Sequence, residues 1–166
     1  MFRARLRADV AIAEGERNTS NRRRVDEKLA SIRCVTTKPA DPVAKVRTIC
    51  MAFPEVTERL SHGAPTWFVR AKTVFVTFWD HGHHEHDFPH LWCAAPTGAQ
   101  AELIAAAPER FFRPPYVGHR GWLGVRMDEE VDWTEIAELC EDAYRVTAPK
   151  RLVRALDDRG DESPAG

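Results

Sequence analysis

Apolar positions along the chain first recur at the spacing of a helix and then at the spacing of strands. Asp41 followed by Pro42 is typical of a helix start, because an Asp caps the first turn and proline suits its first position. One apolar helical face follows, and the helix should end at Pro54. The residues of that face are Val43, Val46, Ile49, Cys50 and Phe53. Clusters of β-branched and aromatic residues between turn-forming residues then predict strands at 58–61, 66–69, 73–79 and 90–95.

The second half of the chain predicts helix, loop, strand and helix. A capping box at 97–100 starts a short helix that ends before Pro108, and a loop is expected over 109–115. Residues 122–127 alternate as a strand, with Leu123, Val125 and Met127 on one face and Trp122, Gly124 and Arg126 on the other. Gly124 should leave a gap between the indole and the guanidinium. Asp132 caps an amphipathic helix that ends near Val146, and 150–156 form a last turn or two.

This order of elements predicts an α+β fold. Closely spaced strands must pair antiparallel, so we expect a two-layer sandwich with one antiparallel sheet and its helices on one face. The other face would meet solvent or a partner, and alternation places Trp122 and Arg126 there, with His90 and Trp92. The chain divides into a basic, flexible extension over 1–38, the folded domain over 39–156, and a flexible tail over 157–166.

Charge is distributed unevenly between these parts. Residues 1–38 carry ten Lys/Arg and five Asp/Glu, whereas residues 39–166 carry 14 and 20. An acidic domain does not favour non-specific nucleic-acid binding, so such binding needs a local basic patch or the basic extension. No apolar run reaches the roughly 18 residues of a membrane span. The four cysteines lack C-x-x-C spacing, which indicates reduced, buried thiols in a cytoplasmic protein.

A set of cations could contact phosphates if the elements that carry them meet. They are Arg70 and Lys72 on a hairpin, Arg113, Arg120 and Arg126 around the strand at 122–127, and Lys150, Arg151 and Arg154 in the last helix. If hairpin and helix converge, these side chains form a phosphate-contacting surface, and Trp122 is available to stack on a base. If they do not, the charges only keep the surface soluble.

Three motif pieces resemble the MmcQ/YjbR family over about residues 41–156. They are His62-Gly63-Ala64-Pro65 with Phe68, Tyr116 with Gly121-Trp122, and a closing helix from Ala143-Tyr144 to Lys150. The resemblance implies a CyaY-like helix–sheet sandwich and a DNA-binding role. It implies no catalytic residue and no cofactor.

The loop DHGHHEHDFPH offers a second chemistry. It brings imidazoles together with carboxylates, which are good zinc or nickel ligands, but a solvated hairpin loop without cysteine explains it as well, and we assign no metal site. The loop holds His81, His83, His84, His86 and His90 beside Asp80, Glu85 and Asp87.

Support for catalysis is weak, so we expect a protein that is not an enzyme. Ser61 and His62 are neighbours on a turn, which should point their side chains apart, and G-x-S-x-G is absent from the sequence. Three hypotheses remain open: DNA binding through the cations, a protein- or small-ligand-binding module on the open sheet face, or metal capture by the histidine-rich loop. The residues of the second are His62, Trp92, Tyr116 and Trp122.

Overall fold

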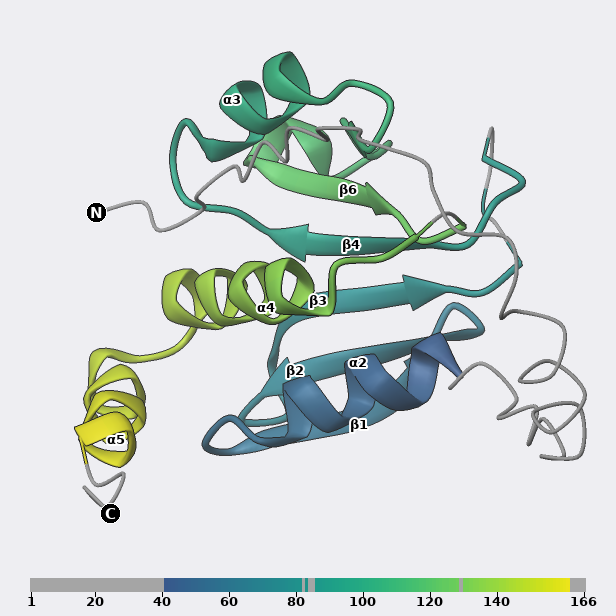
Figure 1. The fold of residues 1–166 in the computed structure, drawn as a ribbon. Coiled ribbons are helices and arrows are strands. Elements are labelled where there is room, and N and C mark those ends of the chain that lie inside the picture. The colour runs from purple at the N-terminus through teal and green to yellow at the C-terminus, as the bar shows by residue number, and fades with distance from the viewer. Residues whose placement is uncertain (1–40, 82, 84–85, 129, 162–166) are drawn as a thin grey trace, which may run out of the picture. The chain divides into compact units, whose positions relative to one another are not determined.

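One antiparallel sheet organises the molecule in the computed structural model, which describes residues 41–81, 83, 86–128 and 130–161 (Figure 1). Its strands are β1 (Val56–Ser61), β2 (Ala64–Val69), β3 (Thr73–Trp79), β4 (His90–Ala94), β5 (Phe111–Phe112) and β6 (Trp122–Arg126). They lie in the order β1-β2-β3-β4-β6-β5. The extension expected over 1–38 lies outside the described residues.

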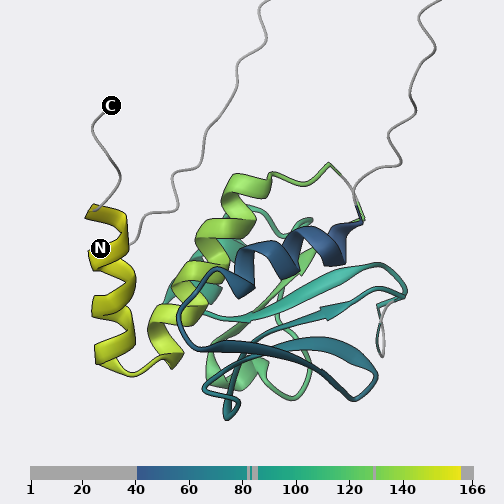
Figure 2. The ribbon, with the colours of Figure 1, turned by 90° about the horizontal axis from the view of Figure 1, so that it is seen from below.

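The helices form the second layer. They are α2 (Pro42–Met51), α3 (Ala99–Ala106), α4 (Trp133–Thr147) and α5 (Lys150–Asp161), with a short 3-10 turn, η1 (Gly118–Arg120). Figure 2 shows α2 and α4 on the same side of the sheet, where α4 contacts β3 and β4 and α2 contacts β1. The predicted α+β two-layer sandwich is therefore confirmed. No helix in the described part of the chain is long and apolar enough to cross a membrane.

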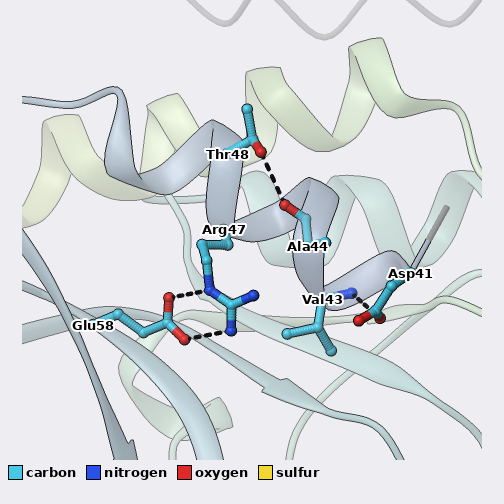
Figure 3. A network of polar contacts seen from close by, with 6 residues as sticks. All are labelled: Asp41, Val43, Ala44, Arg47, Thr48 and Glu58. Atoms are coloured by element: carbon cyan, nitrogen blue, oxygen red, sulfur yellow. Dashed lines mark hydrogen bonds and ion pairs between the residues drawn. The ribbon is translucent and has the colours of Figure 1, made fainter.

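Polar contacts fasten α2 to the edge of the sheet (Figure 3). The Asp41 carboxylate accepts a hydrogen bond of 3.1 Å from the Val43 amide and so caps the helix as predicted. One turn further on, the Arg47 guanidinium donates two hydrogen bonds of 2.7 Å to the Glu58 carboxylate on β1. These bonds raise the pKa of Arg47. This bidentate pair fixes the distance between the helix and the first strand.

The core lies between the sheet and the α2–α4 layer. Its largest fully buried side chains include Trp67, Phe75, Phe78 and Tyr144. The thiols of Cys50, Cys93 and Cys140 are free and buried, as the sequence predicted, and Cys34 lies outside the described residues. Burial raises the pKa of Cys93 well above its ordinary value. These thiols therefore pack as small apolar groups.

Two elements differ from the expectation for the helices. The prediction that a capping box at Thr97 starts the short helix is wrong. Helix α3 begins at Ala99, and its start has no side-chain cap. The preceding Gly98 has a φ of 89°, in the left-handed region. The last helix runs to Asp161 and not to 156, so the first part of the expected tail is helical. Residues 157–161 have no apolar periodicity to reveal this extension, and Asp157 at its start forms an ion pair of 2.7 Å with Arg145 of α4.

The loop expected over 109–115 contains the short edge strand β5. Phe112 pairs with Gly124 in the register of β5 and β6, and a methyl group at Gly124 would overlap the Phe112 ring. The gap expected at Gly124 is therefore filled. Two residues between prolines are too short to give a strand signal, which is why the sequence did not reveal it.

We expect Gly124→Ala to destabilise the domain by about 1–3 kcal/mol, because the Phe112 ring must move to admit the methyl group. Gly160→Ala in α5 is the matched control. No atom lies within 4 Å of a methyl group at Gly160, so stability should be unchanged or slightly higher. Urea unfolding of both variants measures the difference, and equal midpoints would contradict the close packing at Gly124.

Candidate nucleic-acid interface

The two ends of the sheet carry different chemistry. The hairpin end is the end at which β2 turns into β3 through residues 70–72, and β6 begins there because Trp122 pairs with Ala94, the last residue of β4. The histidine end is the opposite one, where β3 leaves toward β4 through residues 80–89. The predicted site residues divide between these two ends.

At the hairpin end, two cations from distant parts of the chain meet one carboxylate. Arg70 on the hairpin lies 3.5 Å from Glu55, and Arg151 on α5 lies 2.8 Å from the same carboxylate. Glu55 belongs to the turn between α2 and β1. The hairpin and the last helix therefore converge. This convergence is the requirement for the phosphate-contacting surface that the sequence suggested. Glu55 itself was missed, because 96 residues separate it from Arg151 and no local pattern links them.

Further cations lie on the same two elements. Lys72 is exposed on the hairpin, and Lys150 and Arg154 are exposed on α5. Helical spacing puts Lys150, Arg151 and Arg154 on one side of α5, while Leu152 is buried. Within the described residues, Lys72, Lys150 and Arg154 form no ion pair. We call Arg70, Lys72, Lys150, Arg151 and Arg154 the basic cluster.

The hairpin tip is held in a strained conformation. Arg70 and Ala71 both have φ of 54°, in the left-handed region that normally favours glycine. The Arg70 amide donates a hydrogen bond of 2.8 Å to the Glu55 carbonyl, and the Lys72 amide donates one of 3.1 Å to the Val69 carbonyl. The strained backbone thus fixes Arg70 beside Glu55 through both main chain and side chain.

Three other predicted cations lie elsewhere. Arg113 and Arg120 are exposed in the β5–β6 connection (residues 113–121), at the hairpin end but beside β6. Arg126 lies at the histidine end, because it pairs with His90 at the start of β4. Its guanidinium lies 2.7 Å from Asp128 and 4.2 Å from the centre of the Phe88 ring. The hydrogen bond from Arg126 lowers the pKa of Asp128. The structure therefore does not bring Arg126 together with the basic cluster.

Two segments that reach the hairpin end lack acidic residues. The segments 59–79 and 110–127 contain no Asp or Glu, and they supply the hairpin and the β5–β6 connection. Much of the acidic charge lies instead between 128 and 142, in and before α4. Eight of the 20 acidic residues counted over residues 39–166 thus lie in this short segment.

The sheet face opposite the helices is covered. The register confirms that His90, Trp92, Trp122 and Arg126 share this face. However, His90 is fully buried and Trp92 is 6% exposed. The His83 ring stacks at 3.7 Å on Trp79, which lies 5.2 Å from Trp92. The expectation of a bare face is therefore wrong, because the β3–β4 connection and Phe112 contribute rings that pack over it.

The histidine loop contributes packing. Besides His83 on Trp79, the His86 ring lies 4.3 Å from Phe112, and the main chains of His83 and His86 pair as an isolated bridge. Among the residues that the structure describes, no group of three or more His, Cys, Asp or Glu could hold a metal ion. His84 and Glu85 lie outside the described residues.

The remaining ligand-face residues do not gather. His62 lies in the β1–β2 turn at the histidine end, on a hollow of about 210 Å³ that Pro65 and Asp80 also line. Tyr116 lies in the β5–β6 connection, and Trp122 is half-buried at the start of β6. The expectation that Ser61 and His62 point apart is wrong, since Ser61 Oγ lies 3.1 Å from His62 Nδ1. The reason is the left-handed φ of 53° at His62 in this tight turn.

Comparisons with known proteins agree with this fold. The model of the YjbR family matches residues 51–146. Among solved structures, the chain is similar to the Deinococcus radiodurans protein DR2400, described as a DUF419 domain, with a TM-score of 0.52 and 16% identity. That match covers 63% of this chain and 76% of DR2400, and at such low identity it shows the fold alone. No curated protein matches this chain.

His90 should make stability depend on pH. Burial lowers its pKa below the ordinary 6.5, against the hydrogen bond between Nδ1 and the Phe88 carbonyl, which raises it. The unfolded chain then binds this proton more readily than the folded one. The contribution of His90 to the free energy of unfolding is therefore fully present above pH about 6.5, where the side chain is neutral in both states. It is lost as the pH falls from there to the folded-state pKa. The total loss is about 1.4 kcal/mol for each unit between the unfolded-state and the folded-state pKa.

Chemical unfolding at several pH values measures this slope. His90→Asn retains a side-chain N–H donor but does not titrate, so its profile should be flatter. His81→Asn is the control, because the His81 side chain is 95% exposed, and it should leave the profile as it is. An unchanged slope in His90→Asn would contradict the role of His90.

Proposed function

This chain belongs to the YjbR family, and we propose that it is a DNA-binding member that is not an enzyme and acts in the cytoplasm. The observation that supports the proposal is the convergence of Arg70 and Arg151 on Glu55. Two elements far apart in the sequence present their cations at one place, and a DNA strand presents phosphates in series.

The ion pairs of the basic cluster suit exchange for phosphate. The Arg70, Glu55 and Arg151 side chains are between two-fifths and three-fifths exposed, and exposed ion pairs contribute at most about 1 kcal/mol. A phosphate oxygen can therefore replace Glu55 at little cost, while the strained turn keeps Arg70 in place. Lys72, Lys150 and Arg154 add charges that form no ion pair in the described part of the chain.

Backbone strain supports the same surface. Non-glycine residues with positive φ among the described residues are Glu55, His62, Arg70, Ala71 and Tyr116. All of them except His62 lie at the hairpin end, in the turn before β1, the β2–β3 hairpin and the β5–β6 connection. Strain of this kind concentrates at functional sites, where the surrounding structure holds it.

The acidic helix layer does not oppose this proposal. Salt screens exposed charges beyond about 8 Å at physiological ionic strength, so a local cluster acts on phosphates independently of distant carboxylates. The alternative, a ligand on the sheet face, would require rings such as Trp79 and His83 to leave Trp92. We therefore place binding at the hairpin end.

Reversing the charge of two residues of the basic cluster should abolish most of the DNA binding. We expect Lys150→Glu with Arg151→Glu to weaken binding of a short labelled DNA strongly at low salt, because two phosphate contacts become repulsive. The slope of log K against log salt should fall by roughly two. Fluorescence anisotropy at several salt concentrations measures both. Arg126→Gln, at the other end of the sheet, is the control and should bind as the unmodified protein does; absence of any binding at low salt would refute the proposal.

Neutralising the shared carboxylate should act in the opposite direction. Glu55→Gln keeps the shape of the side chain and its main-chain contact to Arg70, but it no longer competes with phosphate for two arginines. We expect up to about fivefold tighter DNA binding, which corresponds to about 1 kcal/mol for an exposed pair. Weaker binding in the same assay would contradict the exchange of Glu55 for phosphate. Glu138→Gln on α4 is the matched control and should leave the affinity as it is.

A further inference from the structure

The β5–β6 connection displays an exposed aromatic ring on a strained turn. Tyr116 is 70% exposed, and its φ is 62°. The Val117 amide donates a hydrogen bond of 2.7 Å to the Pro115 carbonyl, so Tyr116 is the central residue of a three-residue turn of the rare, strained kind. This strained position carries a ring that is mostly exposed to solvent. The strain therefore indicates a role in binding.

The connection is held in one shape by internal bonds. The Gly118 amide donates a hydrogen bond of 2.9 Å to the Pro114 carbonyl, which closes a wider turn from Pro114 to Gly118 around Tyr116. From α3, the Gln100 side-chain amide donates to the carbonyls of Gly118, at 2.8 Å, and of Trp122. Tyr116 is thus presented by a segment that is already ordered, which lowers the entropy lost when a ligand binds.

The same connection carries two exposed cations. Arg113 and Arg120 are exposed, and the Arg113 stem crosses Gly118 so closely that a methyl group there would lie 2.5 Å from Arg113 Cγ. The segment 110–127 has no acidic residue, so neither cation has a carboxylate partner within it. An exposed aromatic ring on a segment that also carries two exposed guanidinium groups suits a ligand with a flat ring attached to a phosphate.

We propose that Tyr116 stacks on an unpaired base while Arg113 and Arg120 contact the neighbouring phosphates, so that the DNA bound at the hairpin end is single-stranded. This inference rests on the proposed function and names its substrate class. A duplex hides the faces of its bases in the stack, whereas a single strand offers them to aromatic side chains. The hairpin tip and the β5–β6 connection are three strand spacings apart, about 14 Å, so one strand can cross from the basic cluster to Tyr116.

Three probes separate the base contact from the phosphate contact: single-stranded oligothymidine, an abasic deoxyribose-phosphate strand of equal length, and a matched duplex. The unmodified protein should bind oligothymidine more tightly than either of the others. Tyr116→Ala should weaken oligothymidine binding by about tenfold, as expected for loss of one base–aromatic stack, and leave abasic binding unchanged. An oligouridine arm shows whether RNA supplies the unpaired base equally well.

Control variants keep the test specific. Tyr116→Phe retains the ring and should retain oligothymidine binding. Leu60→Ala removes another exposed apolar side chain, 73% exposed on β1, and should have no effect. Thermal unfolding verifies that each variant is folded.

The outcomes distinguish this inference from the proposed function. Equal losses on oligothymidine and on the abasic strand would overturn the stack. Duplex binding that is as tight as oligothymidine binding, sensitive to Lys150→Glu with Arg151→Glu and insensitive to Tyr116→Ala, would also overturn it while leaving the proposed function intact. Failure to bind any of the probes would overturn both.

Discussion

The buried hydroxyl of Tyr144 sets the geometry on which the candidate interface depends. It donates a hydrogen bond of 2.8 Å to the Pro54 carbonyl, and its ring packs against Phe53 at 5.0 Å and Phe75 at 5.8 Å. Burial raises the pKa of this hydroxyl, so it remains a donor throughout the neutral range. The contact joins the last turns of α4 to the turn that carries Glu55. Because α5 follows α4 directly, Arg151 is delivered to Glu55, and the hairpin completes the cluster.

This arrangement lets an acidic domain carry a basic surface. Eight of the 20 carboxylates of residues 39–166 lie between 128 and 142, in and before α4, whereas the segments 59–79 and 110–127, which have no Asp or Glu, make their turns at the hairpin end. The net charge of the whole chain influences its solubility, but the binding of a charged ligand depends on where the charges lie. The same end carries four of the strained non-glycine residues. Strain, cations and an exposed aromatic ring are therefore found in one region.

Much of the fold could be predicted from the sequence, because periodicity and capping are local. The Asp41 and Asp132 caps and the face of the strand from Trp122 followed from a few residues each. The strand β5 could not be found, since two residues give no period. The burial of the sheet face opposite the helices could not be predicted, because it depends on how the polar β3–β4 connection folds back over the sheet. The ion pair of Glu55 with Arg151 could not be predicted either, because 96 residues separate the two. Sequence reasoning thus found most cations of the interface and missed the group that joins them.

An amide NMR titration of the protein with single-stranded DNA tests binding at the hairpin end most directly, because it maps the contact without altering a residue. If DNA binds at the hairpin end, signals should shift or broaden at residues 70–72, 113–121 and 150–154. Signals of the β1–β2 turn and of the exposed side of α4 should stay in place. Shifts concentrated around His62 and His81, or a spectrum that does not change, would contradict binding at the hairpin end.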